Sequence, residues 1–166
     1  MTDLRPYQSV VIAECSQIIA LGQRRPLIVA PTGAGKTVVA AAIIKTAMAE
    51  QRRVLVLGHT REIIKQTSLK LSGYQVEHGI IQADLEGNFN QSVQVASIQT
   101  LWSRAMRTDR MALPAADLLI IDEAHRCPDR FNRHSVPGRR ARFGRHIRRD
   151  CRMPTSARIN PTRFPR

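Results

Sequence analysis

A short segment rich in small residues, Ala30-Pro31-Thr32-Gly33-Ala34-Gly35-Lys36-Thr37, constrains the fold of this chain more than any other feature of its sequence. The apolar run 26–30 leads into it and predicts a buried strand, and the Ala- and Ile-rich run 36–50 predicts a helix after it. A glycine-rich turn between a buried strand and a helix is typical of proteins whose helices pack on a parallel sheet. The segment therefore predicts an α/β fold.

The same segment has the composition of a phosphate-binding loop. Gly33 and Gly35 permit a tight turn that aims backbone N–H groups at phosphate oxygens, and the following helix dipole adds to the attraction. Lys36 would reach the β- and γ-phosphates, and the Thr37 hydroxyl would ligate Mg²⁺. The strict pattern has glycine at the position of Ala30, and the alternative is a glycine-rich turn beside a solvated lysine. The predicted contacts to a nucleoside triphosphate are Thr32, Gly33, Ala34, Gly35, Lys36 and Thr37.

Helical and strand spacings alternate through the first 129 residues. The spacing predicts helices at 7–21, 36–50, 61–71 and 98–106, and strands at 26–30, 53–58, 93–97 and 118–121, with a weaker strand at 75–81. Strands separated by helices indicate βαβ units and a largely parallel sheet. Hydrophobic residues make up 43% of the chain and aromatic residues only 4%, so the core must be aliphatic.

The sequence lacks the features of secreted and membrane proteins. No apolar run approaches the length of a membrane span, and the N-terminus has no basic-then-apolar signal pattern. The three cysteines, Cys15, Cys127 and Cys151, are scattered and odd in number, which does not fit a disulfide framework. We therefore expect a cytoplasmic protein with no membrane partner.

The positive charge of the chain is concentrated in its last part. The formal net charge is +13, yet residues 1–129 hold 14 basic and 12 acidic side chains. Residues 130–166 hold 12 arginines and one carboxylate, Asp150. Their scattered apolar residues match neither period, so this segment predicts a disordered basic tail. Twelve arginines could bind nucleic acid without sequence preference, and frame-shifted reading of a GC-rich gene would also produce this composition.

Two adjacent carboxylates, Asp122 and Glu123, follow the aliphatic run 118–121 directly. Carboxylates at the end of a buried strand are costly unless they meet a cation, and open α/β sheets bind ligands at that end. Asp122 is placed to hold Mg²⁺, and Glu123 to orient or deprotonate the attacking water, so that Lys36, Asp122 and Glu123 form the predicted catalytic set. The alternative is a pair that caps the next helix.

These motifs resemble those of the DEAH-type superfamily 2 helicases. Asp122-Glu123-Ala124-His125 resembles motif II, and residues 30–37 are similar to motif I. Leu4-Arg5-Pro6-Tyr7-Gln8 looks like the adenine-reading segment of the branch that includes type III restriction subunits. The resemblance implies a RecA-like domain that binds ATP and Mg²⁺, an adenine contact from Gln8, and coupling of the nucleotide site to the next motif by His125. The alternative for His125 is a partly buried structural histidine.

Two further segments fit the resemblance, His59–Gln66 as motif Ia and Ala96–Leu101 as the segment that follows it. In the family these loops contact the phosphate backbone of nucleic acid, with DNA favoured here over RNA. Hydroxyl and N–H groups at helix N-termini suit such contacts, and ordinary helix capping is the alternative for each residue. The matching positions are Thr60, Arg61, Ser97, Gln99 and Thr100.

The resemblance also indicates what the chain lacks. The family has a second RecA-like domain that supplies arginine fingers, and a central strand ending in Ser/Thr-Ala-Thr between the strands of motifs I and II. Neither is found after Asp122. Because a missing central strand leaves backbone groups unpaired on both neighbours, we expect an incomplete, truncated domain that is marginally stable or prone to aggregation.

The sequence thus predicts two regions, a truncated helicase ATP-binding domain at 1–129 and an Arg/Pro-rich tail at 130–166. The predicted function is the ATP-binding part of a nucleic-acid-dependent ATPase or helicase, poorly active or inactive as an isolated chain. One alternative is a non-catalytic protein that binds nucleic acid through its tail. Another is a different kind of P-loop ATPase, which motif Ia and Gln8 disfavour.

Overall fold

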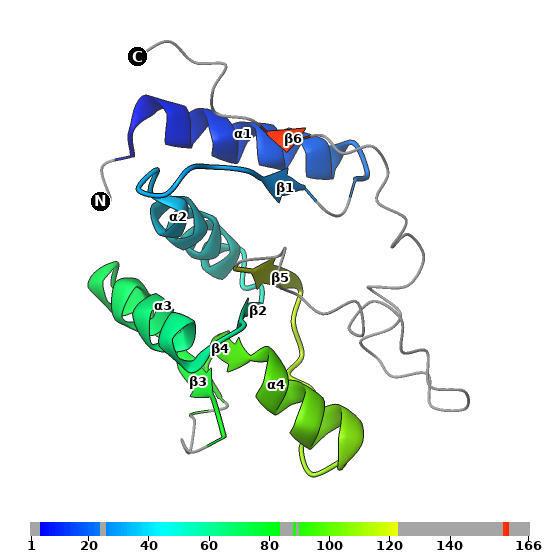
Figure 1. Ribbon diagram of the computed structural model, residues 1–166. Coiled ribbons are helices and arrows are strands. Elements are labelled where there is room, and N and C mark those ends of the chain that lie inside the picture. Colours follow the sequence, from blue (N-terminus) through cyan, green and yellow to red (C-terminus); the bar gives the residue numbers. More distant parts are fainter. Residues whose placement is uncertain (1–3, 24–25, 84–87, 89, 123–157, 160–166) are drawn as a thin grey trace.

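The computed structural model describes residues 4–23, 26–83, 88, 90–122 and 158–159 (Figure 1). Its helices are α1 (Pro6–Ala20), α2 (Lys36–Ala49), α3 (Arg61–Gly73), α4 (Ile98–Leu101) and the π-helix η1 (Trp102–Arg107). Its strands are β1 (Leu27–Ile28), β2 (Val54–Gly58), β3 (Gly79–Ile81), β4 (Val93–Ser97), β5 (Leu118–Ile121) and β6 (Arg158–Ile159). The predicted α/β class is confirmed.

Four strands form one parallel sheet in the order β3-β4-β2-β5. The central strand β2 is fully buried, with Val54 opposite Val93 of β4 on one side and Leu118 of β5 on the other. Asp117, just before β5, accepts a hydrogen bond from the backbone N–H of Arg53 at 2.9 Å, which aligns the starts of the two strands. The predicted parallel sheet is therefore confirmed.

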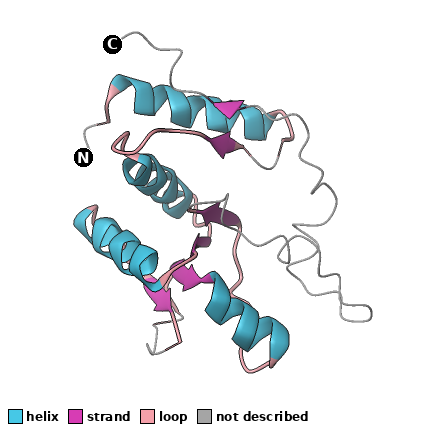
Figure 2. Cartoon of the chain, in the orientation of Figure 1, coloured by secondary structure: helices cyan, strands magenta, loops and turns pink. Residues whose placement is uncertain are grey.

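Helices α2 and α3 lie along one face of this sheet and α4 along the other (Figure 2), and aliphatic side chains pack on both faces. On one face, Ile44 of α2 and Ile64 of α3 pack on Val56 of β2 and its neighbours. On the other face, Leu101 of α4 packs with Leu57 of β2. No aromatic side chain is among the fully buried residues of the described chain, as the low aromatic content predicted.

Helix α1 packs on α2 and β1 through a smaller cluster centred on Val11, Cys15 and Val39. Burial raises the pKa of the Cys15 thiol, and the nearby charge of Glu14 raises it further. Cys15 therefore acts as a small apolar residue in this contact. No helix within the described ranges is long and apolar enough to span a bilayer.

The structure differs from the sequence prediction at the helix after β4. Helical spacing predicted one helix over 98–106, whereas α4 ends at Leu101 and continues as the π-helix η1. The carbonyl of Ser103 accepts from the N–H of Thr108, and that of Arg104 accepts from the N–H groups of Arg110 and Met111. Each of these hydrogen bonds spans more residues than the four of an α-helical bond, so the end of the helix is wider than an α-helix.

The strand β1 is shorter than predicted and lies outside the four-stranded sheet. It pairs in parallel with β6, with Leu27 opposite Arg158. Residues 158–159 of the predicted tail form this short partner strand, because the unpaired backbone of β1 accepts an extended segment. The other residues of 130–166 lie outside the described residues.

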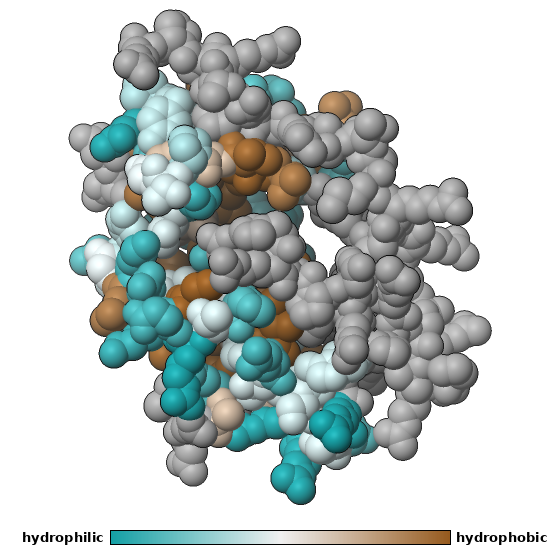
Figure 3. All heavy atoms as spheres, viewed as in Figure 1, coloured by the Kyte–Doolittle hydropathy of each residue, from teal (hydrophilic) through white to brown (hydrophobic). Residues whose placement is uncertain are grey.

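The sequence predicts that a central strand is missing between the strands that precede the glycine-rich loop and Asp122, which are β1 and β5. No described strand lies between these two. The side chains of β5 are only partly buried, in contrast to those of β2 and β4. Val29, next to β1, is 45% exposed, and Ile121 at the end of β5 is 36% exposed. Figure 3 shows apolar side chains gathered over β1 and again over the four-stranded sheet.

The ion pair of Asp117 with Arg53 predicts a dependence of stability on pH. The backbone and side-chain hydrogen bonds from Arg53 hold the pKa of Asp117 below its ordinary value. A carboxylate whose pKa is lowered on folding stabilises the fold above its unfolded pKa, and this contribution disappears as pH falls through its folded pKa.

We therefore expect the difference in unfolding free energy between wild type and Asp117→Asn to shrink from about pH 7 to about pH 3. Urea denaturation of both chains at several pH values measures this difference. A difference that stays constant over that range would contradict the assigned role of the Asp117 carboxylate.

Candidate nucleotide site

The loop between β1 and α2 has the backbone shape of an anion-binding turn. Gly33 and Gly35 have φ values of +83° and +73°, which residues with a side chain rarely adopt. The N–H of Ala34 donates to the carbonyl of Pro31 at 3.2 Å and closes the turn. Gly35 is the N-cap of α2 and has no side chain to cap the helix. This conformation explains why glycine occupies these two positions.

The first N–H groups of α2 are available to an anion. Within the described part of the chain, no acceptor takes the backbone N–H groups of Gly35, Lys36 or Thr37. Such groups carry the positive end of the helix dipole and bind phosphate readily. The loop therefore fits the phosphate-binding function that its sequence predicts.

The side chain of Lys36 folds back over the loop. Its ammonium donates to the carbonyls of Ala30 at 3.1 Å and Pro31 at 3.3 Å, and the residue is exposed. Carbonyls are weaker partners for an ammonium than phosphate oxygens. Lys36 is thus held beside the loop by bonds that an entering phosphate could replace.

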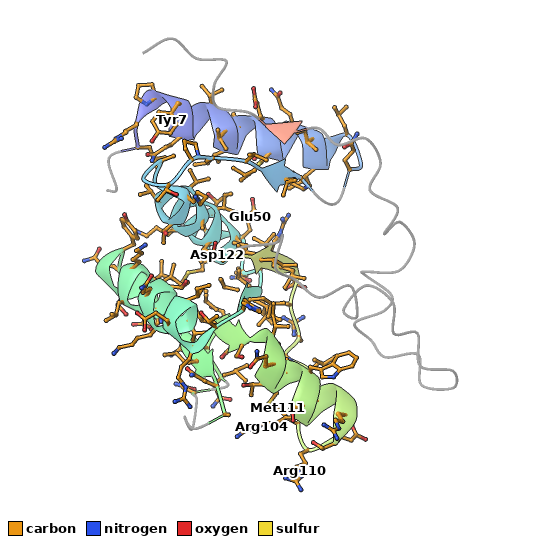
Figure 4. The ribbon with its side chains drawn as sticks, in the orientation of Figure 1. Tyr7, Glu50, Arg104, Arg110, Met111 and Asp122 are labelled. Carbon is orange, nitrogen blue, oxygen red and sulfur yellow. The ribbon has the colours of Figure 1, made fainter. Side chains whose placement is uncertain are left out.

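The start of α1 lies against this loop. The Tyr7 hydroxyl donates to the carbonyl of Ala34 at 2.8 Å, and the Gln8 amide lies 3.4 Å from the same oxygen. The Gln8 side-chain oxygen accepts from the backbone N–H of Arg5 at 3.0 Å, and Gln8 is only 3% exposed. The sequence singled out Gln8 and missed Tyr7, although Tyr7 directly precedes it in the motif. Figure 4 shows Tyr7 on α1 above the loop.

The other predicted groups lie at the same edge of the fold. Four residues separate the end of α2 at Ala49 from the start of β2 at Val54, so the N-terminus of α2 points toward the carboxyl edge of the sheet. Asp122 follows β5 at this edge, where its N–H donates to the carbonyl of Leu57 at 3.0 Å (Figure 4). The structure therefore puts Thr37 and Asp122, the predicted Mg²⁺ ligands, on one side of the molecule.

The residues predicted to contact nucleic acid lie at the starts of α3 and α4, at the same edge of the sheet. The Thr60 hydroxyl caps α3 by accepting from the N–H of Ile63 at 3.3 Å, and the Ser97 hydroxyl caps α4 by accepting from the N–H of Thr100 at 3.4 Å. Ser97 and Thr100 are buried, whereas Arg61 and Gln99 are exposed. Thr60 and Ser97 therefore act as helix caps here, and only Arg61 and Gln99 present exposed side chains.

Two predicted site residues, Glu123 and His125, lie outside the described residues. Their proposed roles as the water-activating carboxylate and the coupling histidine therefore stay predictions.

Comparisons with known proteins agree with the geometry. The family model ResIII, described as type III restriction enzyme, res subunit, matches residues 1–146. The chain is 33% identical over 135 residues to the putative ATP-dependent helicase IRC3 of Saccharomyces cerevisiae, covering 74% of this chain and 19% of the yeast protein. It is 28% identical over 134 residues to the type I restriction enzyme EcoKI endonuclease subunit of Escherichia coli, covering 74% of this chain and 12% of that subunit.

A solved structure has the same fold. A nuclease-deletion mutant of the type ISP restriction-modification enzyme LlaGI, in complex with a DNA substrate mimic, matches with a TM-score of 0.57 and 15% identity. The match covers 75% of this chain and 15% of the LlaGI chain. The chain thus spans less than one fifth of the length of each of these three proteins.

Proposed function

The chain belongs to the ResIII family of type III restriction enzyme res subunits, and on this premise we propose that residues 1–129 bind MgATP as the first RecA-like domain of a nucleic-acid-dependent helicase or translocase. The single observation that carries the proposal is the loop before α2. Two glycines there hold a left-handed backbone and three N–H groups have no acceptor within the described residues. Lys36 already lies over the same loop.

The donors at this site suit a triphosphate with its magnesium ion. The N–H groups of Gly35, Lys36 and Thr37 would receive phosphate oxygens, and the Lys36 ammonium would neutralise their charge. The Thr37 hydroxyl and the Asp122 carboxylate are hard oxygen ligands of the kind that Mg²⁺ prefers. Bound Mg²⁺ would supply charge neutralisation at the phosphates. Glu123 is proposed to orient the attacking water, and His125 to couple the site to the rest of the protein.

DNA is the proposed nucleic-acid partner. The matched LlaGI structure contains a DNA substrate mimic, and the exposed side chains of Arg61 and Gln99 stand at the edge where α3 and α4 begin. An arginine and an amide there suit contacts to the phosphate backbone without base readout. The arginines of residues 130–166 would add a salt-dependent contact to the same partner.

We expect ATP binding without fast turnover from the chain on its own. Helicases of this superfamily, as the motifs imply, bind ATP between two RecA-like domains, and the second domain supplies the arginine that stabilises the transferring phosphoryl group. The 166 residues contain one set of nucleotide-binding motifs. Localisation in the cytoplasm is proposed on the sequence alone.

Calorimetric titration with MgATP tests the proposal. We expect Lys36→Ala to weaken binding about 10- to 100-fold, because it removes a hydrogen bond between an ammonium and a charged phosphate. Lys70→Ala, which removes an exposed lysine from the last turn of α3, is the matched control and should bind as wild type does. Equal affinity of the wild type and Lys36→Ala chains would refute a triphosphate site at this loop.

A further inference from the structure

The hydroxyl of Tyr7 links the first turn of α1 to the loop before α2. It donates to the carbonyl of Ala34 at 2.8 Å, across 27 positions of sequence. The Gln8 amide lies 3.4 Å from the same carbonyl and 3.4 Å from the Tyr7 hydroxyl. Neither residue makes this contact through the backbone, so the link depends on these two side chains.

The link fixes the direction of one peptide unit in the loop. The described peptide bonds are all trans, and in a trans unit the C=O of one residue and the N–H of the next point in opposite directions. Because the Ala34 carbonyl points at Tyr7 on α1, the N–H of Gly35 must point away from α1. That N–H has no acceptor within the described residues.

We propose that Tyr7 is a positioning residue for phosphate binding, whose hydroxyl holds the Ala34–Gly35 peptide so that the Gly35 N–H faces the phosphates. The inference rests on the proposed nucleotide site and adds a residue to it. Without this bond the peptide could rotate, because its rotation changes ψ of Ala34 and φ of Gly35, and glycine adopts positive and negative φ about equally well. The hydroxyl removes this freedom before the ligand arrives, and such preorganisation strengthens binding.

The proposed role differs from reading the base. Tyr7 acts on the loop that meets the phosphates, so its loss should weaken binding of any ligand that carries the phosphate chain. If Tyr7 instead contacted adenine, its loss would weaken the binding of ATP and leave the affinity for a ligand without a base unchanged. Magnesium tripolyphosphate is such a ligand.

The experiment compares Tyr7→Phe with wild type in titrations with MgATP, MgGTP and magnesium tripolyphosphate, using the full 166-residue chain. We expect the affinities for all three to fall by the same factor, about three- to tenfold, which is the range for one neutral hydrogen bond. The ratio of ATP to GTP affinity should not change. Tyr74→Phe removes the other tyrosine hydroxyl of the chain, at the C-cap of α3, and should bind as wild type does.

A second measurement uses the wild type chain alone and does not depend on the folding of a variant. Addition of magnesium tripolyphosphate should move the amide proton resonance of Gly35 downfield in NMR spectra, because that N–H gains a phosphate acceptor. A Gly35 resonance that stays unmoved at saturation would overturn the inference.

The outcomes separate the two claims. If the wild type binds the ligands and Tyr7→Phe binds them equally well, or loses affinity for ATP alone, the positioning role is overturned. The nucleotide site itself is then still supported. A wild type chain that binds none of the three ligands overturns both. A common loss for all three ligands, absent in Tyr74→Phe, supports the positioning role.

Discussion

Replacing Leu57 with alanine is expected to lower the free energy of unfolding by about 2–5 kcal/mol, the range for truncating a buried leucine. Leu57 is fully buried in β2, the strand that pairs with both β4 and β5. Its side chain belongs to the cluster that holds α4 on the sheet. Because the side chains around a truncated core residue relax only partially, we expect the substitution to leave a cavity.

Leu69→Ala is the matched control for this prediction. Leu69 lies on α3 and is 64% exposed, so the same three-carbon truncation there should change the unfolding free energy by less than about 0.5 kcal/mol. Urea denaturation followed by circular dichroism measures both variants. Equal effects at the two positions would mean that the core does not form around β2 as described.

The sequence predicted most of the helices and strands, because each of them buries one regular set of apolar side chains. The run Val54–Gly58 is aliphatic and becomes the fully buried β2, and the apolar run Leu118–Ile121 becomes β5. The phosphate loop was predicted for a different reason. Its glycines are required by a backbone conformation, and Gly33 and Gly35 have the positive φ values that this conformation needs.

The remaining features depend on particular hydrogen bonds and on contacts between distant segments, which the spacing of apolar residues does not report. The π-helix η1 follows from hydrogen bonds that the Ser103 and Arg104 carbonyls accept from the next loop. The pairing of β6 with β1 joins residues more than a hundred positions apart. The contact of Tyr7 with Ala34 is of the same kind, and for this reason the motif pointed to Gln8 alone.

The predicted nucleic-acid contacts show a related limit. A Ser or Thr before a helix has one sequence pattern whether it caps the helix or contacts phosphate. Ser97 and Thr100 are 7% and 6% exposed, which identifies the capping role for Ser97 and leaves neither side chain at the surface. Variants at Arg61 and Gln99, which are exposed, are therefore better tests of DNA contact than variants at Ser97 or Thr100.

The replacement of Gly35 by alanine is expected to weaken MgATP binding about 30-fold or more and to destabilise the fold by about 2–4 kcal/mol. A left-handed backbone costs a residue with a Cβ about 1–2 kcal/mol, and Gly35 has a φ of +73°. The added Cβ would also lie 2.5 Å from the Gln8 amide nitrogen and 3.3 Å from Cγ2 of Val38. Gln8 must then leave the Ala34 carbonyl, which removes part of the link between α1 and the loop.

Gly33→Ala separates the two causes. Gly33 has a φ of +83°, but an added Cβ would meet nothing within 4 Å, so this variant carries only the backbone cost. We therefore expect Gly33→Ala to destabilise the fold by about 1–2 kcal/mol and Gly35→Ala by more. The two variants are compared by urea denaturation and by titration with MgATP.

The double variant Gln8→Ala/Gly35→Ala identifies the side chain responsible. If the clash with Gln8 causes the extra loss, truncating Gln8 removes it, and the stability changes of the two single variants should not add. Residues in contact typically depart from additivity by about 0.5–3 kcal/mol. Additive losses, or a Gly35→Ala chain no less stable than Gly33→Ala, would show that the Gln8 side chain moves away from an added Cβ at little cost. The bond of the Tyr7 hydroxyl to the Ala34 carbonyl does not involve Gln8, so this experiment tests the Gln8 contact separately from the role of Tyr7.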